Sequence, residues 1–328
     1  MFSFSSTIYQ KAINGIPPTL DEALRILNSH SSELTAIFAA THALRDHFFG
    51  KNIELCSIIN AKSGRCAENC SFCAQSSHHT TQAPIFPLKS KEEMVMGAQQ
   101  AAMAGSHCYG IVTSGTRVKS GEEFERILST IREIRETTTI APSASLGILN
   151  ETNAAALSEA GCSTYHHNLE TARSFFPKIC TTHDYEEDIK TVRTAKSTGM
   201  KVCCGGIFGL GESLEQRVEL CMTLLELDVD SIPLNFLNPI AGTPLENQQQ
   251  LTPLDCLRII ALFRIVHPKK RISICGGREV NLRDFQSWIF MAGASGTMIG
   301  NYLTTSGRDS AADLQMFIDA EVTIDACC

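Results

Sequence analysis

The sequence predicts an α/β protein, a closed (β/α)8 barrel of the TIM type with a helical extension at its N-terminus. Strand-like stretches alternate with helical stretches along most of the chain, as in proteins that build parallel sheets. There are eight such strand-like stretches, the number that closes this kind of barrel. No linker rich in Pro, Gly or Ser divides the 328 residues. An open doubly wound sheet is the alternative, because the number of strands alone does not exclude it.

Two helices come first. Thr19-Leu-Asp-Glu22 has the form of a capping box, and residues 32–47 carry apolar side chains at helical spacing. The predicted strands then follow at 53–59, 109–113, 140–146, 163–169, 201–207, 231–237, 271–275 and 296–299. Two further capping boxes, at 90–93 and 213–216, open helices between strands. We expect an N-terminal extension at 1–50, a barrel at 51–320 and a tail at 321–328.

Composition excludes several classes of protein. The net charge is −7 and no basic block occurs, which argues against nucleic acid as the main partner. No apolar run is long enough to cross a bilayer, and the first residues do not have the pattern of a secretion signal. The chain has 14 cysteines. Without a secretion signal, they indicate thiols kept reduced or a metal-binding protein, and we expect a cytoplasmic location.

The most informative motif is the cysteine loop, Cys66-Ala-Glu-Asn-Cys70-Ser-Phe-Cys73. Thiolates are the usual ligands of iron–sulfur clusters, and a compact loop lets several reach one cluster. A cubane has four iron corners and this loop offers three cysteines, so one iron would stay open for another ligand. An open metal position is typical of a reactive site. In the predicted barrel the loop follows the first strand, at the rim where such barrels carry their chemistry.

Two other readings of this loop are weaker. Zinc usually takes two pairs of ligands and no second pair lies nearby, although His78 or His79 could supply a fourth ligand. A disulfide framework does not suit three clustered thiols.

The CxxxCxxC loop resembles that of the radical S-adenosylmethionine enzymes, and the surrounding residues resemble the biotin synthase family. The similar segments extend from about Leu20 to about Phe317, and the segments that carry the likeness are 55–66, 73–77, 165–170, 201–212, 238–245 and 290–294. The resemblance implies a [4Fe–4S] cluster on Cys66, Cys70 and Cys73 whose open iron binds S-adenosylmethionine. It also implies reductive cleavage to a 5′-deoxyadenosyl radical, hydrogen abstraction from dethiobiotin and insertion of sulfur to give biotin.

The resemblance also implies roles for single residues. Phe72 matches an aromatic position near the adenine, and Asn168 and Glu170 match positions that hold the ribose hydroxyls. Asn235 matches a position that binds the ureido ring of dethiobiotin, and His166 stands at the substrate wall where the family usually has Asn. The adenine-contacting GxIxGxxE pattern is matched by Gly205, Ile207, Gly209 and Glu212. Simple turn geometry is the alternative for the glycines, and a satisfied polar group in the barrel is the alternative for Asn235.

The chain departs from the family at the second cluster. Gly110, Ser143, Cys203 and Ser273 stand where three cysteines and one arginine usually hold a [2Fe–2S] cluster. Only Cys203 remains, so we hypothesise a relocated auxiliary cluster of another type on Cys203 and Cys275, with Cys108 as a further candidate. Strand alternation turns Cys275 to the face of Ser273 and Cys108 to the face of Gly110. The adjacent Cys204 should point away.

The terminal pair, Cys327 and Cys328, could fold back as ligands. Five cysteines are expected to be ordinary buried residues: Cys56, Cys162, Cys180, Cys221 and Cys256. The resemblance is to variant biotin synthases that lack the arginine ligand and carry a larger auxiliary cluster.

Three functions remain open at this point. The first is dethiobiotin-to-biotin conversion, with a flavodoxin- or ferredoxin-type electron donor and a homodimer implied by the resemblance. The second is a relative with the same barrel, such as a hydrogenase cluster maturase or a methylornithine-forming mutase. The third is a non-catalytic iron–sulfur sensor, which would not need Glu212, Asn168 or Asn235.

Overall fold

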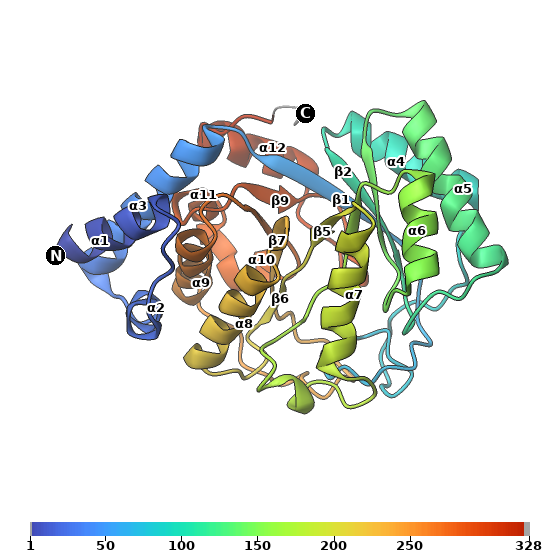
Figure 1. Ribbon diagram of the computed structural model, residues 1–328, viewed down its shortest axis with the longest axis horizontal. Coiled ribbons are helices and arrows are strands. Elements are labelled where there is room, and N and C mark those ends of the chain that lie inside the picture. Colours follow the sequence, from blue (N-terminus) through green and yellow to red (C-terminus); the bar gives the residue numbers. More distant parts are fainter. Residues whose placement is uncertain (1, 325–328) are drawn as a thin grey trace.

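The computed structural model describes residues 2–324, and its strands form one parallel sheet that closes into a barrel (Figure 1). The strand order is β5-β4-β3-β2-β1-β9-β8-β7-β6, and a β5–β7 pairing closes the ring. The strands are β1 (Glu54–Lys62), β2 (Cys108–Thr113), β3 (Ala141–Ser145), β4 (Thr164–His166), β5 (Lys201–Cys203), β6 (Gly206–Phe208), β7 (Ser231–Phe236), β8 (Arg271–Ile274) and β9 (Gly296–Met298). The closed barrel is confirmed and the open sheet is excluded.

One predicted strand is divided. The stretch expected at 201–207 forms two segments, β5 and β6, separated by Cys204 and Gly205. Both segments pair with β7, so they occupy one position in the barrel and the ring has eight positions. The break has a steric cause: a Cβ on Gly205 would lie 2.0 Å from the carbonyl oxygen of Pro233. Only glycine allows the two backbones to come so close.

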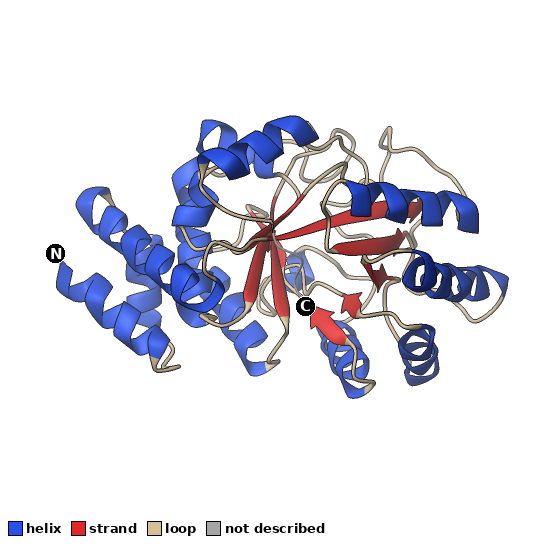
Figure 2. Ribbon diagram, turned by 90° about the horizontal axis from the view of Figure 1, so that it is seen from above, coloured by secondary structure: helices blue, strands red, loops and turns tan. Residues whose placement is uncertain are grey.

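Helices surround the barrel, and Figure 2 shows them outside the strands. The outer helices are α4 (Lys91–Met103), α5 (Glu122–Thr137), α6 (Glu151–Ala160), α7 (Tyr185–Ser197), α8 (Leu214–Glu226), α9 (Pro253–Val266), α10 (Arg278–Leu282), α11 (Trp288–Met291) and α12 (Ser310–Asp319), with short 3₁₀ turns η1 (Phe176–Lys178) and η2 (Arg283–Phe285). The predicted capping boxes open α4 and α8, where Ser90 and Ser213 each accept a hydrogen bond from the backbone three residues on.

The N-terminal extension has three helices at one end of the molecule, α1 (Phe2–Ile13), α2 (Leu20–Leu27) and α3 (Ser31–Phe49) (Figure 1). The capping box at Thr19 opens α2 as predicted. Helix α1 was not predicted, although Phe4, Ile8 and Ala12 are four residues apart and all three are buried. That spacing is the signal that could have found it.

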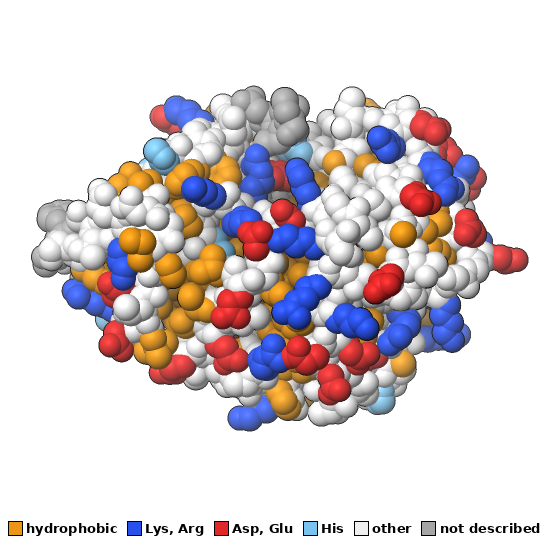
Figure 3. Space-filling model, viewed as in Figure 1, with side chains coloured by type: hydrophobic (Ala, Val, Ile, Leu, Met, Phe, Trp, Pro, Cys, Tyr) orange, Lys and Arg blue, Asp and Glu red, His pale blue; other side chains and the backbone are white. Residues whose placement is uncertain are grey.

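The face seen in Figure 3 mixes acidic and basic side chains, with no large field of one sign. This agrees with the absence of a basic block from the sequence. None of the helices within residues 2–324 combines the length and apolar character that a membrane span requires.

Candidate active site

A cavity of about 380 Å³ opens at the C-terminal ends of the barrel strands and continues into the barrel. Its wall includes the cysteine loop and residues from β1, β2, β3, β4, β5, β7 and β8. A second cavity of about 280 Å³ adjoins it, and the two share Phe72, Cys73, Asn168, Glu170 and Asn235. The cysteine loop and these predicted site residues therefore lie together at the end of the barrel where the βα-loops meet.

All three loop cysteines line the larger cavity. The loop is held by its own backbone: the amide of Cys66 donates to the carbonyl of Gln75 (3.1 Å), and that of Cys73 donates to the carbonyl of Cys70 (2.9 Å). Burial raises the pKa of the Cys73 thiol to about 11. A metal must displace the protons of such thiols to bind them.

Neither histidine proposed as a zinc ligand faces these thiols. His78 Nε2 lies 2.9 Å from the carbonyl oxygen of Ala67, and His79 Nε2 lies 3.1 Å from that of Cys70. Each imidazole is engaged with the backbone of the loop. The three thiols therefore have no histidine partner from this pair, which removes the main support for a structural zinc site.

Cys180 is an unexpected neighbour of the loop. A hydrogen bond between the thiols of Cys70 and Cys180 raises the pKa of Cys70 and lowers that of Cys180. We expected Cys180 to be an ordinary core residue, but it lines the cavity. The sequence carried no signal for this contact, because Cys180 lies in the loop after η1, more than 100 residues from Cys70.

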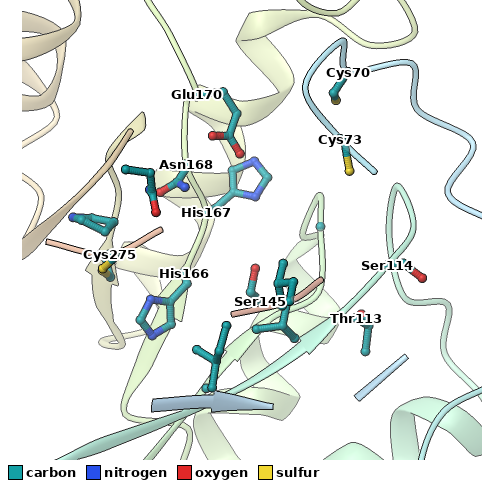
Figure 4. A pocket seen from close by; sticks show the side chains of 18 of the residues that line it. Cys70, Cys73, Thr113, Ser114, Ser145, His166, His167, Asn168, Glu170 and Cys275 are labelled. Carbon is teal, nitrogen blue, oxygen red and sulfur yellow. The ribbon is translucent and has the colours of Figure 1, made fainter. Parts of the chain in front are cut away.

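Asn168 and Glu170 follow β4 and face the space beside Cys70 and Cys73 (Figure 4). Asn168 Oδ1 accepts a hydrogen bond from the amide of Gly205 (3.1 Å), which fixes the amide group. Glu170 has φ 61°, a left-handed conformation that is uncommon for a residue with a side chain. Burial, followed by the nearby charge of Asp188, raises its pKa to about 8. Its Oε2 is buried and has no hydrogen-bond partner within residues 2–324.

Of the GxIxGxxE residues, only Ile207 lines a cavity, the smaller one. Glu212 Oε1 instead accepts hydrogen bonds from the amide of Gly209 (3.0 Å) and from Arg217 Nε (2.8 Å). Glu212 thus closes the turn after β6. Gly209 belongs to this turn, whereas Gly205 lies at the break between β5 and β6, so both glycines have a backbone role, which is the alternative that we gave for them.

Asn235 lines both cavities, whereas His166 lines only the larger one of the two. Asn235 Oδ1 accepts from the amide of Gly276 (2.9 Å) and its Nδ2 donates to the carbonyl of Gly206 (3.2 Å). One N–H and one lone pair of this amide remain for a ligand. Burial lowers the pKa of His166 to about 4, so the imidazole is neutral, and its buried Nε2 has no partner among the described residues.

The barrel interior brings four thiols into one cavity: Cys56, Cys108, Cys203 and Cys275. Three were predicted to share this space, whereas Cys56 was expected to be an ordinary core residue. A hydrogen bond to the thiol of Cys275, together with burial, raises the pKa of Cys56 well above its usual value. Cys56 also lies opposite Cys108 in the β1–β2 register. Strand alternation could have found it, because Glu54, Cys56 and Ile58 all line the cavity.

The other interior cysteines behave as expected. Cys204 is fully buried in the apolar core and does not line the cavity, in agreement with strand alternation. Cys108 donates to Ser143 Oγ (3.1 Å), the position where the family usually has a cysteine. Cys327 and Cys328 lie outside the described residues.

Carboxyl groups outnumber cationic groups in the larger cavity. Its described lining contains the carboxyl groups of Glu54, Glu68, Glu170 and Asp188, and it contains neither Lys nor Arg. Three histidines also line it: burial lowers the pKa of His166 to about 4, whereas burial at His183 is outweighed by hydrogen bonds that raise its pKa to about 11. Such a wall favours cationic occupants.

Two family models match the chain. Residues 61–224 match the Radical SAM superfamily, and residues 233–323 match the Biotin and Thiamin Synthesis associated domain. The first contains the cysteine loop, Asn168 and Glu170, and the second contains Asn235 and Cys275.

Curated relatives match over nearly the full length. A biotin synthase of Geotalea daltonii is 61% identical over 319 residues, which are 97% of each chain. A biotin synthase of Geobacter metallireducens is 60% identical over 322 residues, 98% of each chain.

Solved structures agree in fold. A methylornithine synthase has a TM-score of 0.84 at 21% identity and covers 96% of each chain. A maturase of the [FeFe]-hydrogenase has a TM-score of 0.85 at 17% identity and covers 100% of this chain and 76% of its own. At these identities the likeness concerns the barrel alone.

Proposed function

This chain belongs to the biotin synthase family of radical S-adenosylmethionine enzymes, and we propose that it converts dethiobiotin to biotin by inserting sulfur. Hydrogen is abstracted from the substrate by a 5′-deoxyadenosyl radical. The observation that carries the proposal is the meeting of the Cys66–Cys73 loop with Asn168, Glu170 and Asn235 around two adjoining cavities. Identities of 61% to biotin synthases, against 17–21% to the maturase and the methylornithine synthase, favour this reaction over theirs.

The cysteine loop suits a [4Fe–4S] cluster. Its three soft donors lie in a cavity with acidic walls, and this donor set favours iron–sulfur over a hard cation. Cys66, Cys70 and Cys73 would hold the cluster, with S-adenosylmethionine at the remaining iron. Together the bound cluster and S-adenosylmethionine supply the 5′-deoxyadenosyl radical.

Residues of the chain bind and orient the ribose and the adenine of S-adenosylmethionine. The unpartnered Oε2 of Glu170 accepts a ribose hydroxyl, and the remaining hydrogen-bonding capacity of Asn168 serves the same sugar. Phe72 and Ile207 contact the adenine in the smaller cavity. Gly209 and Glu212 hold the turn that follows Ile207, and Gly205 allows the close backbone approach that precedes it.

Dethiobiotin lies between the two sets of thiols. The free N–H and lone pair of Asn235 pair with the ureido ring, and neutral His166 on β4 offers Nε2. The barrel walls exclude water from the reacting carbon, which protects a radical from side reactions.

The interior thiols suit the auxiliary iron–sulfur cluster of the family. We assign its ligands to Cys203 and Cys275, as the sequence suggested, and add Cys56 and Cys108, because all four line one cavity. Four soft donors fit iron–sulfur chemistry and leave no role for an arginine. When bound, this cluster holds inorganic sulfide in the chamber that receives the substrate.

Iron and acid-labile sulfide per chain test this assignment. The C203A/C275A double variant should lose the auxiliary iron and keep the iron of the loop, and C56A should lower the auxiliary iron further than a C221A control. Cys221 is a buried residue of α8 and does not line the cavity. Counts equal to the parent would end the assignment.

The remaining parts of the proposal concern partners and organisation. A flavodoxin- or ferredoxin-type donor supplies the electron, and the protein acts as a cytoplasmic homodimer, as the resemblance to biotin synthases suggests. Residues 51–320 act as one catalytic barrel, with 1–50 as an extension and 321–328 as a tail.

One experiment tests the reaction. The anaerobically reconstituted and reduced protein receives S-adenosylmethionine with and without dethiobiotin. We expect 5′-deoxyadenosine and biotin from the parent and neither from C73A. Formation of 5′-deoxyadenosine without biotin would reject dethiobiotin conversion, and its absence would reject radical chemistry altogether.

A further inference from the structure

A cluster of metal-binding side chains lies at the mouth of the large cavity, apart from the cysteines assigned above. Glu68 stands in the cysteine loop, and Cys180 and His183 follow η1 in another loop. Their donor atoms all lie within 4.8 Å of one another. His183 Nδ1 is 2.7 Å from Glu68 Oε2 and 3.3 Å from Cys180 Sγ, and Cys180 Sγ is 4.0 Å from Glu68 Oε2.

We propose that Glu68, Cys180 and His183 form a site for one divalent cation of borderline softness, of the Zn²⁺ or Fe²⁺ class. One thiolate, one imidazole and one carboxylate are the donor types that such cations take, usually in tetrahedral geometry. Mg²⁺ and Ca²⁺ prefer all-oxygen sites and do not suit the sulfur of Cys180.

The surroundings hold the three ligands in place. Asp188 accepts a hydrogen bond from His183 Nε2 (3.3 Å) and pairs with His167 Nε2 (2.8 Å). This is the arrangement of a carboxylate behind a metal-binding histidine, which fixes the ring and its tautomer. Thr116 and Thr182 donate hydroxyls to the carboxylate oxygens of Glu68. Cys180 and Asp188 are each 3% exposed.

In the metal-free chain, hydrogen bonds hold the same groups together. His183 Nδ1 contacts Glu68 and Cys180, and His183 Nε2 contacts Asp188. Binding of the cation displaces any proton on His183 Nδ1 and on the thiol of Cys180, and these protons pass to solvent. No electron is transferred.

The site would join two loops that both border the cavity. Glu68 lies between Cys66 and Cys70, and Cys180 lies beside Cys70. A cation here therefore fixes the loop after η1 against the cysteine loop. The three ligands do not include Cys66, Cys70 or Cys73, so the site can be tested in a chain that lacks those three thiols.

The test uses the full-length chain in a C66A/C70A/C73A background, which removes the loop thiols. The anaerobic, metal-free protein is titrated with Co²⁺ alone, and bound cobalt is measured together with thiolate-to-cobalt absorption. We expect the background protein to hold one equivalent more than the same protein with C180A or H183Q. C162A and H78Q are the matched controls, because Cys162 is buried elsewhere and His78 faces the loop backbone.

A second measurement addresses ligand identity. Zn²⁺ alone is added to the parent with its clusters loaded, and zinc-edge X-ray absorption should give one Zn–S distance of about 2.3 Å with nitrogen and oxygen neighbours. C180S, which keeps the volume of the side chain, should abolish that sulfur signal if C180A fails to fold. Equal cobalt uptake with and without Cys180 or His183, or a zinc ion with four sulfur neighbours, would overturn the proposal.

Discussion

Arg278 donates two hydrogen bonds to the carboxylate of Asp313, at 3.0 and 2.7 Å, and both side chains are 1% exposed. This pair joins α10 to α12. Beside it, Glu279 accepts hydrogen bonds from the hydroxyl of Tyr302 (2.9 Å) and the amide of Arg308 (3.0 Å). Because Tyr302 lines the smaller cavity, α10 connects its ion pair with α12 to a wall of the active site.

The first prediction concerns this buried ion pair. D313A removes the two carboxylate oxygens that accept hydrogen bonds from the buried Arg278 guanidinium and leaves it a longer, 3.7 Å contact with Glu279, so we expect the free energy of unfolding to fall by about 3 kcal/mol. The control is E133A, whose partner Lys91 is 37% exposed, and a loss of about 0.5 kcal/mol or less is expected there. Denaturant titration measures both. Equal losses would mean that the buried pair has no special role.

The second prediction follows from the raised pKa of Glu170. The unfolded chain loses this proton near 4.5, whereas the folded chain keeps it to about 8. The folded state therefore binds more protons in this window, and the stability that Glu170 contributes falls as pH rises, by up to about 1 kcal/mol per pH unit. The E170Q variant has no carboxyl group to titrate at this position, so it does not lose this stability as pH rises.

E170Q should accordingly gain stability relative to the parent between pH 5 and pH 8, with the smallest difference at pH 5. Denaturant midpoints of the cluster-free chain at three pH values measure the trend. E159Q, an exposed position on α6, should show no trend. A difference that stays constant with pH would contradict a buried, protonated Glu170.

The third prediction concerns Asn235. N235A leaves the amide of Gly276 and the carbonyl of Gly206 without this partner and removes the proposed contact to the ureido ring. We expect KM for dethiobiotin to rise about tenfold or more, from the loss of one to two hydrogen bonds. The exposed Asn247 provides the control variant N247A. An unchanged KM would remove Asn235 from the substrate site.

The fourth prediction concerns the divided strand. G205A places a methyl group 2.0 Å from the carbonyl oxygen of Pro233, so β5 and β7 must separate or the chain must fail to fold. We expect a loss of about 3 kcal/mol or more, or insoluble protein. G50A meets nothing within 4 Å but has φ 59°, so only a conformational cost of about 1 kcal/mol is expected. Similar solubility and stability of the two variants would argue against the steric account.

Sequence reasoning predicted the barrel and the loop of Cys66, Cys70 and Cys73 from local patterns. Strand and helix periodicity depends on neighbouring residues, and a ligand loop of eight residues needs no distant partner. Alternation also placed Cys108, Cys203 and Cys275 on inward faces. The resemblance to a family pointed to Asn168, Glu170 and Asn235, which line the cavities, and also to Gly205, Gly209 and Glu212, which line neither of the two.

Only the tertiary structure decided which inward residues meet. The thiol contact of Cys56 with Cys275 joins β1 to the end of β8, and both strands pair with β9 between them. The contact depends on how the barrel closes and on the stagger between its strands. Strand alternation specifies neither of these. The cluster of Glu68, Cys180 and His183 joins positions 112–115 residues apart in two irregular loops. Loops have no repeating pattern, so their side chains meet only through the fold that brings the loop ends together.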